Sequence, residues 1–306
     1  MSGQVTRRPE GDSMSRQTIV SAVRSGVTLV SDGAWGTMLQ SAGLAPGECP
    51  ELWNVEHPDR VYRIALGYAQ AGADLLETNS FGGSRLKLEQ YGIADRCAEI
   101  NEAAARLSRN AAGDRRWVLG SVGPTGKMLV LGEVSADDLY DVFAEQVAAL
   151  ERGGCDAICV ETMSDIQEAA LAVRAAREHT SLEVIATFTF ERTVRGDYRT
   201  MMGAGPVDAT RAMLEAGADI VGTNCGNGFA RMVDIVREIR AAFPDAPILV
   251  HANAGVPVHE HGVDRYSDTP ELMASLAPQL VSAGASIVGG CCGTGPEHIS
   301  AIRRAL

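Results

Sequence analysis

A phrase built from a small residue, a glycine and a short apolar run recurs along the chain. It reads AGADLLETN at 71–79, GGCDAICVET at 153–162, AGADIVGTN at 216–224 and AGASIVGGC at 283–291. Each copy follows a segment with helical periodicity, so the pattern predicts a helix that ends at a glycine and leads into a buried strand. The polar residues that close each copy then lie at the carboxyl end of that strand.

Other apolar runs lie between or beside these copies, at 27–33, 117–124, 183–190 and 247–255. Together the runs predict eight strands that mostly alternate with helices. This count favours a single-domain α/β protein folded as a (β/α)8 TIM barrel. A doubly wound open sheet is the alternative, but no G-x-G-x-x-G motif opens a helix after the first strand. We expect the barrel at residues 16–306, after a disordered N-terminal lead-in at residues 1–15.

The composition disfavours several classes of protein. The net charge is −12 and lysine and arginine form no stripe, so we expect no nucleic-acid partner. No apolar run reaches the roughly 18 residues of a membrane span, and the polar N-terminus lacks the apolar stretch of a secretory signal. We therefore expect a cytoplasmic protein without membrane contact. Seven cysteines, an odd number, favour a metal site or a reactive thiol over a disulfide framework.

Three of the cysteines follow nearby strands of the predicted barrel. Cys225 ends the sixth strand, and Cys291 and Cys292 end the eighth. Only the seventh strand separates these ends, so we expect the three thiolates to converge. Such a set of ligands selects zinc, and three protein ligands leave a fourth position open, as in catalytic zinc sites.

The adjacent cysteines pose a geometric problem, because neighbouring side chains of a strand point to opposite faces. The flanking Gly289, Gly290 and Gly293 allow the backbone to leave strand geometry, so that both sulfurs can turn toward one ion. A strained vicinal disulfide between Cys291 and Cys292 is the alternative, and it requires an oxidising compartment.

Further polar residues close the predicted strands and are expected at the same mouth of the barrel. They are Asp32, Glu77, Thr78, Asn79, Ser121, Glu161, Thr162, Thr223, Asn224 and Asn253. From spacing alone, Asp32 also fits a turn or helix cap, and Glu161 also fits a solvated strand end. We expect His251 to be an interior histidine, and we do not expect His259 and His261, in a polar loop, to bind metal.

Several motifs together resemble a known family. They are SDGAWGTML, ETNSFGGSRLKL, GSVGPTGK, VETMSDIQEA, GTNC, HANAGVP and GGCCGTGPEHI. The combination resembles the zinc-dependent homocysteine S-methyltransferases from about residue 28 to the end of the sequence. GSVGPTGK and NAGVP are most similar to the homocysteine-binding domain of cobalamin-dependent methionine synthase. The barrel fold of that family agrees with the strand count.

The resemblance implies one zinc ion per chain on Cys225, Cys291 and Cys292. It implies that zinc accepts the substrate sulfur and holds it as a thiolate, which attacks a methyl group to form methionine. Asp32 and Gly33 match residues that hold the amino-acid part of homocysteine, and Glu161 matches the acidic residue that pairs with its ammonium. Asn253 is expected either to hold the substrate or to support the metal ligands.

The methyl donor is open at this stage. The sequence has neither the long C-terminal extension of the betaine-dependent branch nor the further modules of full-length methionine synthase. We therefore expect either a methylated corrinoid on a partner protein or a small sulfonium such as S-methylmethionine. Alternatives are a methyltransferase subunit that acts on another thiol or on a corrinoid protein, and a subunit that binds zinc and homocysteine but is inactive without its partner.

Overall fold

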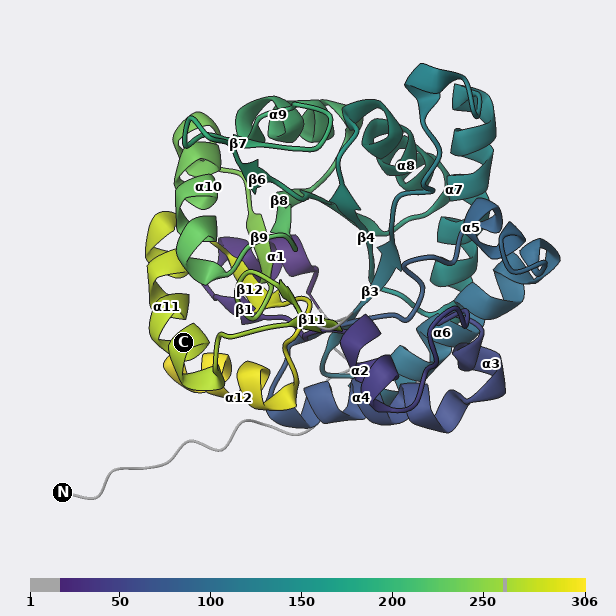
Figure 1. Ribbon diagram of the computed structural model, residues 1–306, viewed down its shortest axis with the longest axis horizontal. Helices are drawn as coiled ribbons and strands as arrows, with labels where there is room; N and C mark the ends of the chain where they lie inside the picture. Colours follow the sequence, from purple (N-terminus) through teal and green to yellow (C-terminus); the bar gives the residue numbers. More distant parts are fainter. Residues whose placement is uncertain (1–16, 261–262) are drawn as a thin grey trace.

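Eight parallel strands form one sheet that closes on itself in the computed structural model, which describes residues 17–260 and 263–306 (Figure 1). The strands are β1 (Leu29–Val30), β2 (Leu75–Glu77), β3 (Trp117–Val122), β4 (Ala157–Met163), β5 (Glu183–Phe188), β8 (Ile220–Asn224), β9 (Ile248–Ala252) and β12 (Ile287–Gly290). Their order is β1-β12-β9-β8-β5-β4-β3-β2. A parallel bridge between Ser31 and Leu75 joins the two ends of this series. The predicted (β/α)8 barrel is confirmed, and closure excludes the open sheet.

Helices surround the strands as an outer ring (Figure 1). The helices of the described residues are α1 (Ile19–Arg24), α2 (Gly36–Ser41), α3 (Trp53–Glu56), α4 (Pro58–Ala71), α5 (Arg85–Glu89), α6 (Cys97–Ala112), α7 (Ala136–Gly153), α8 (Ile166–His179), α9 (Pro206–Ala216), α10 (Phe229–Ala242), α11 (Pro270–Ala283) and α12 (Pro296–Ala305), with short 3-10 turns at Ala94–Arg96 and Leu129–Leu131. The repeated glycines predicted to end helices do so. Gly72, Gly154, Gly217 and Gly284 have φ of 97°, 104°, 105° and 117°, a left-handed conformation that glycine adopts without a steric cost.

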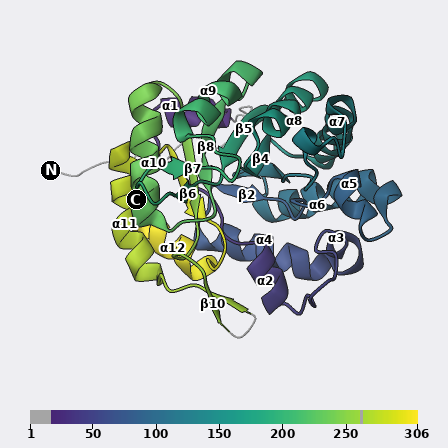
Figure 2. The same ribbon diagram turned by 45° about the horizontal axis from the view of Figure 1, so that its top comes forward.

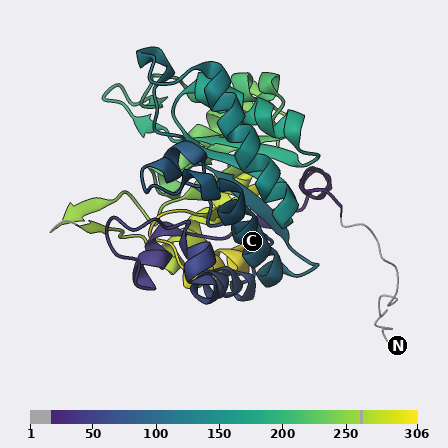
Figure 3. The same ribbon diagram turned by 90° about the vertical axis from the view of Figure 1, so that its right-hand side faces the viewer.

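The barrel interior is filled by apolar side chains, at least one from every strand of the sheet. They are Leu29, Leu75, Trp117, Leu119, Ala157, Cys159, Ile185, Ile220, Leu249 and Ile287. Ile19 and Ala22 of α1 pack against this cluster, and the Glu183 carboxylate accepts hydrogen bonds from the backbone N–H groups of Ile19 (2.6 Å) and Val20 (2.9 Å). The helix α1 therefore closes the end of the barrel at which the strands begin (Figure 3).

The opposite end carries the loops that follow the strands. Two of these loops contain hairpins, β6–β7 (Glu191–Arg192 with Tyr198–Arg199) and β10–β11 (Val258–Glu260 with Val263–Arg265). The second hairpin projects from the barrel (Figures 2 and 3). His259, predicted in a loop, lies on β10, and His261 lies outside the described residues. Within the described part of the chain, no helix is both long and apolar enough to cross a membrane.

Candidate metal centre and substrate pocket

The three predicted cysteines converge at the barrel mouth. Cys225 directly follows β8, and Cys291 and Cys292 directly follow β12. The sulfur of Cys292 lies 4.0 Å from the sulfurs of both Cys225 and Cys291, and all three sulfurs lie within 4.8 Å of one another. The other cysteines, Cys49, Cys97, Cys155 and Cys159, are buried outside this group.

The backbone around the cysteines departs from strand geometry, as expected, but the glycines contribute in two different ways. After Gly290 the chain forms a turn closed by the Thr294 N–H and the Cys291 carbonyl (3.1 Å), with Gly293 at φ 81°. Gly289 and Gly290 instead belong to β12 and do not have positive φ. Glycine is needed there because a Cβ would overlap neighbouring atoms, those of Thr294 in the case of Gly290. Of the three glycines, only Gly293 has the predicted role of allowing an unusual backbone conformation.

The electrostatics of the cysteine group favour a shared negative charge. The pKa of the Cys225 thiol is lowered, because the sulfurs of Cys291 and Cys292 hydrogen-bond to it. The pKa values of Cys291 and Cys292 are raised, first by their hydrogen bonds to Cys225. A tetrahedral zinc ion with Zn–S bonds of about 2.3 Å places its sulfurs about 3.8 Å apart. Two of the observed separations, at 4.0 Å, are close to that value, and the third is within 4.8 Å, so the three residues fit a zinc ion.

Asp32 is fully buried beside the pocket, between β1 and β2. Its Oδ2 accepts hydrogen bonds from Trp35 Nε1 (3.2 Å) and from the Glu77 backbone N–H (2.8 Å). Burial, and then the charge of Glu77, raise the pKa of Asp32 well above its usual value. Its contacts tie the turn after β1 to β2, and the adjacent Gly33 lines the pocket.

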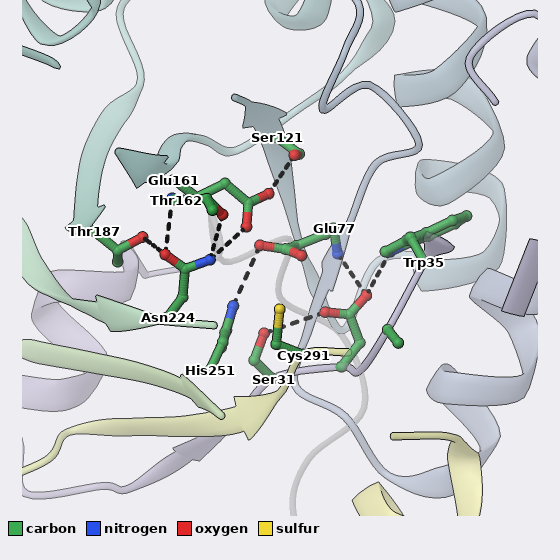
Figure 4. Close-up of polar contacts among 12 residues, drawn as sticks. Ser31, Trp35, Glu77, Ser121, Glu161, Thr162, Thr187, Asn224, His251 and Cys291 are labelled. Carbon is green, nitrogen blue, oxygen red and sulfur yellow. Dashed lines mark hydrogen bonds and ion pairs between the residues drawn. The ribbon is translucent and has the colours of Figure 1, made fainter. Parts of the chain in front are cut away.

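Glu161 is held at the end of β4 by two neighbours. Its Oε1 accepts a short hydrogen bond from the Ser121 hydroxyl, and its Oε2 accepts one from Asn224 Nδ2 at 3.2 Å (Figure 4). The side chain is buried, so it is not a solvated strand end. Burial, and then the charge of Glu77, raise the pKa of Glu161 to about 8.

Asn224 is the centre of the network around Glu161. Its Nδ2 also donates to the Thr162 hydroxyl (2.6 Å), and its Oδ1 accepts from the Thr162 N–H and the Thr187 hydroxyl (both 2.8 Å). Thr162 has φ 59°, a strained conformation for a β-branched residue. The Asn224 amide therefore fixes both the Glu161 carboxyl group and the unusual backbone beside it.

His251 and Glu77 form a pair deeper in the site. His251 Nδ1 lies 3.4 Å from Glu77 Oε1, and His251 Nε2 is buried without a hydrogen-bond partner among the described residues. Burial lowers the pKa of His251 and raises that of Glu77 to about 7. The prediction of an interior histidine is confirmed.

Asn253 lies next to the cysteines. Its side chain hydrogen-bonds to the Cys225 sulfur, which contributes to the lowered pKa of that thiol. Its backbone N–H donates to the Asn227 carbonyl at 3.0 Å. Within the described residues its buried Oδ1 has no hydrogen-bond partner.

A cavity of about 380 Å³ joins these groups. Its lining includes all three clustered cysteines, Glu161, Glu77 and Gly33, with Trp35, Leu39, Pro50 and Phe81 on the apolar side. Glu51, also buried, completes an acidic lining, which includes no lysine or arginine among the residues that the structure describes. A cavity that joins a thiol cluster to buried carboxyl groups is suited to a small molecule that carries both a sulfur and an ammonium group.

Glu51 of the cavity lining, Thr294 and Tyr68 were not predicted from the sequence. Thr294 belongs to the cysteine turn, and Tyr68 lies on α4 with its hydroxyl on the Ala34 carbonyl (2.6 Å). Tyr68 falls in the apolar periodicity of a helix, where it cannot be distinguished from a core residue. Thr294 stands two positions after the cysteine pair, and that proximity was the available signal.

Comparison with known proteins identifies the family. The family model described as homocysteine S-methyltransferase matches residues 29–306. The chain belongs to the homocysteine S-methyltransferase family. The resemblance inferred from the motifs is thereby confirmed.

Some of the known proteins that are similar to this chain are much longer than it is. Methionine synthases of Mycobacterium tuberculosis and Mycobacterium leprae are each 34% identical over 297 residues, which covers 91% of this chain and 24% of theirs. The chain thus spans about a quarter of the length of these relatives. Among solved structures, the metallated form of the homocysteine methyltransferase MmuM from Escherichia coli shares the fold, with a TM-score of 0.76 and 22% identity over 94% of this chain and 99% of that one.

Proposed function

We propose that this protein transfers a methyl group to the thiolate of homocysteine and so forms methionine. The observation that carries the proposal is the shared cavity, in which the sulfurs of Cys225, Cys291 and Cys292 lie on the same lining as the carboxyl group of Glu161. Homocysteine carries a thiol at one end and an ammonium group at the other. The thiol matches the cysteine cluster, and the ammonium group matches the carboxyl group of Glu161.

In this proposal Cys225, Cys291 and Cys292 hold one zinc ion. When bound, zinc supplies a Lewis acid that keeps the substrate thiol deprotonated at neutral pH. The side chain of Asn253 hydrogen-bonds to the Cys225 sulfur and so orients that ligand. We assign Asn253 this supporting role rather than direct contact with the substrate, because it does not line the cavity.

The amino-acid end of homocysteine is assigned to Glu161 and Gly33. An ammonium ion favours the charged form of a neighbouring carboxyl group. Since burial raises the pKa of Glu161 to about 8, binding of the ammonium at neutral pH releases a proton from Glu161. Gly33 offers its backbone to the substrate carboxylate, and Asp32 holds that backbone in place through Trp35 and Glu77.

The methyl transfer itself is a displacement at carbon. The thiolate sulfur of homocysteine forms the new bond to the methyl carbon, the bond between methyl group and donor breaks, and the donor leaves with that electron pair. No side chain has to accept a proton in this step, because the thiol has already lost it. The protein contributes by aligning the sulfur, through the cysteine cluster at one end and Glu161 at the other.

The donor is either a methylated corrinoid on a partner protein or a small sulfonium such as S-methylmethionine. The methionine synthase relatives favour the first, since the matched region is one part of a longer protein. The lining favours the second, because its carboxyl groups suit a small cation. The alternatives are transfer to another thiol, and a subunit that binds zinc and homocysteine but needs its partner for turnover.

The test is a methyl-transfer assay of the zinc-loaded protein with homocysteine. S-methylmethionine, betaine, free methylcobalamin and a methylated corrinoid protein are supplied in separate reactions, and methionine is quantified by mass spectrometry. Cysteine replaces homocysteine in a parallel series that tests the acceptor. Methionine formation with any donor supports the proposal. Turnover only with the corrinoid protein identifies a partner-dependent enzyme, and turnover only with another thiol refutes homocysteine as the acceptor.

A further inference from the structure

Two turns face each other at the barrel mouth. The clamp turn, residues 32–35, follows β1, and the cysteine turn, residues 291–294, follows β12. The strands β1 and β12 are paired neighbours, with Val30 beside Val288. In the proposed function the clamp turn holds the amino-acid end of homocysteine and the cysteine turn carries two of the three zinc ligands. The distance between the two turns therefore determines whether both ends of one substrate can bind together.

The hydroxyl group of Thr294 joins the two turns. Its Oγ1 accepts a hydrogen bond from the Ala34 N–H at 3.1 Å and donates one to the Cys291 carbonyl at 2.7 Å. Thr294 is 1% exposed, so these bonds are shielded from water. The hydroxyl thus connects a backbone donor of the clamp turn to a backbone acceptor of the cysteine turn.

Tyr68 and the backbone reinforce this connection. The Tyr68 hydroxyl lies 2.6 Å from the Ala34 carbonyl and 3.3 Å from the Thr294 carbonyl, so it can donate to either turn. The Gly290 N–H donates to the Asp32 carbonyl at 2.8 Å. The Gly290 hydrogen bond joins the two segments directly, and the Tyr68 hydroxyl, from α4, contacts one carbonyl of each turn.

The backbone of both turns approaches the Thr294 hydroxyl closely. A Cβ on Gly33 would lie 2.6 Å from Thr294 Oγ1, and a Cβ on Gly290 would lie closer still. Both glycines therefore let the two turns approach until the hydroxyl bridges them. A methyl group in place of the hydroxyl makes neither hydrogen bond, and it has to move away from the Cys291 carbonyl oxygen, because 2.7 Å is too short for a contact between carbon and oxygen.

We propose that Thr294, supported by Tyr68, is a positioning residue that sets the distance between the metal ligands and the amino-acid clamp. This inference rests on the proposed function. A substrate attached at both ends gains affinity only when its two sites are held at a matching distance. Loss of the bridge is expected to weaken the binding of homocysteine, whereas zinc, which contacts only the cysteines, is held as before.

The experiment compares zinc-loaded wild-type protein with Thr294→Val, Thr294→Ser and Tyr68→Phe. Thr180→Val is the matched control, since the Thr180 hydroxyl also donates to a backbone carbonyl (Ala176, 2.7 Å) but lies at the end of α8. Isothermal titration measures the Kd of homocysteine and of 2-mercaptoethanol, a thiol that lacks the amino-acid end. A chelator competition measures zinc affinity.

The Kd of homocysteine is expected to rise about tenfold in Thr294→Val, the loss for one buried hydrogen-bonding group. Tyr68→Phe should produce a smaller rise, while Thr294→Ser and Thr180→Val stay close to wild type. Zinc affinity and the Kd of 2-mercaptoethanol should not change in any variant. This selective loss of affinity for homocysteine distinguishes a positioning role from general destabilisation, which would weaken the binding of zinc and of both thiols together.

Two results would overturn the positioning role while leaving the proposed function intact. One is an equal loss of affinity for homocysteine and 2-mercaptoethanol in Thr294→Val. The other is an unchanged Kd of homocysteine in both Thr294→Val and Tyr68→Phe. If Thr294→Val does not fold, Tyr68→Phe alone decides, because it removes only a hydroxyl. Zinc-loaded wild-type protein that binds no homocysteine would overturn the proposed function, and the positioning role with it.

Discussion

Replacement of Glu161 by glutamine is expected to make the protein more stable and less able to bind its substrate. Glutamine keeps the shape of the side chain, and its amide can donate to the Ser121 hydroxyl while its oxygen accepts from Asn224, the two partners of Glu161. The change therefore removes the titratable group and little else.

The magnitude follows from the raised pKa of Glu161. Burial raises this pKa from 4.5 to about 8, so the unfolded chain loses its proton above pH 4.5 while the folded protein keeps it until about pH 8. The stability contributed by Glu161 consequently falls as the pH rises between these values and is constant above them. At pH 7 this effect lowers the free energy of unfolding of the wild type by about 3 kcal/mol. The glutamine variant has no such loss, so it should be more stable by that amount.

The assay is urea denaturation of metal-free, reduced protein at about pH 5, 7 and 8.5, because a bound cation would itself lower the pKa of Glu161. Wild type and Glu161→Gln should differ little near pH 5 and by about 3 kcal/mol at pH 7. The Kd of homocysteine for the zinc-loaded variant should rise roughly tenfold to a hundredfold, the loss for a charge-assisted hydrogen bond. A stability difference that does not grow with pH would refute the reasoning, since Glu161 would then be ionised in the folded protein.

Three further changes probe the surroundings of the site. Asn224→Ala removes the amide that holds Glu161. The KM for homocysteine should therefore rise about tenfold, and the free energy of unfolding should fall by about 2 kcal/mol. An unchanged KM would show that Glu161 needs no such support. Gly290→Ala should destabilise the protein by about 1–3 kcal/mol, because the new methyl group overlaps Thr294, and a melting temperature equal to that of wild type would contradict the packing. His259→Ala should leave the zinc content at one ion per chain, and a loss of zinc, measured by mass spectrometry, would place His259 in the metal site.

Much of the fold could be predicted because its signal repeats. The glycine that ends each helix and the apolar run after it appear in all four copies of the phrase, and Gly72, Gly154, Gly217 and Gly284 adopt the expected left-handed conformation. The convergence of the cysteines followed from the barrel, since strands β8 and β12 flank β9. The hairpin β10–β11 was not predicted, because its polar residues resemble those of a loop.

The details of the site could not be predicted, because they depend on contacts between distant segments. The role of Asn224 requires Thr162, Thr187 and Glu161 to meet, and three strands bring them together. Likewise, the sequence suggested that Gly290 permits an unusual backbone, whereas the structure shows a close approach to Thr294. The lead-in at residues 1–15, the cytoplasmic location, the zinc ligands and the substrate contacts stay predictions.

The central claim is that three cysteines hold a zinc ion that activates a substrate thiol. The most direct test combines zinc content with calorimetry in buffers of different ionisation enthalpy, for wild type, Cys292→Ala and Cys155→Ala. Cys155 is the matched control, because it is a buried cysteine outside the cluster. Methionine, which has the same amino-acid end but no thiol, is titrated beside homocysteine.

We predict one zinc ion per chain in wild type and Cys155→Ala and its loss in Cys292→Ala. Homocysteine should release one more proton than methionine at neutral pH, because only homocysteine has a thiol to deprotonate. Wild-type protein that holds no zinc after reconstitution under reducing conditions, or equal proton release by the two ligands, would contradict the account.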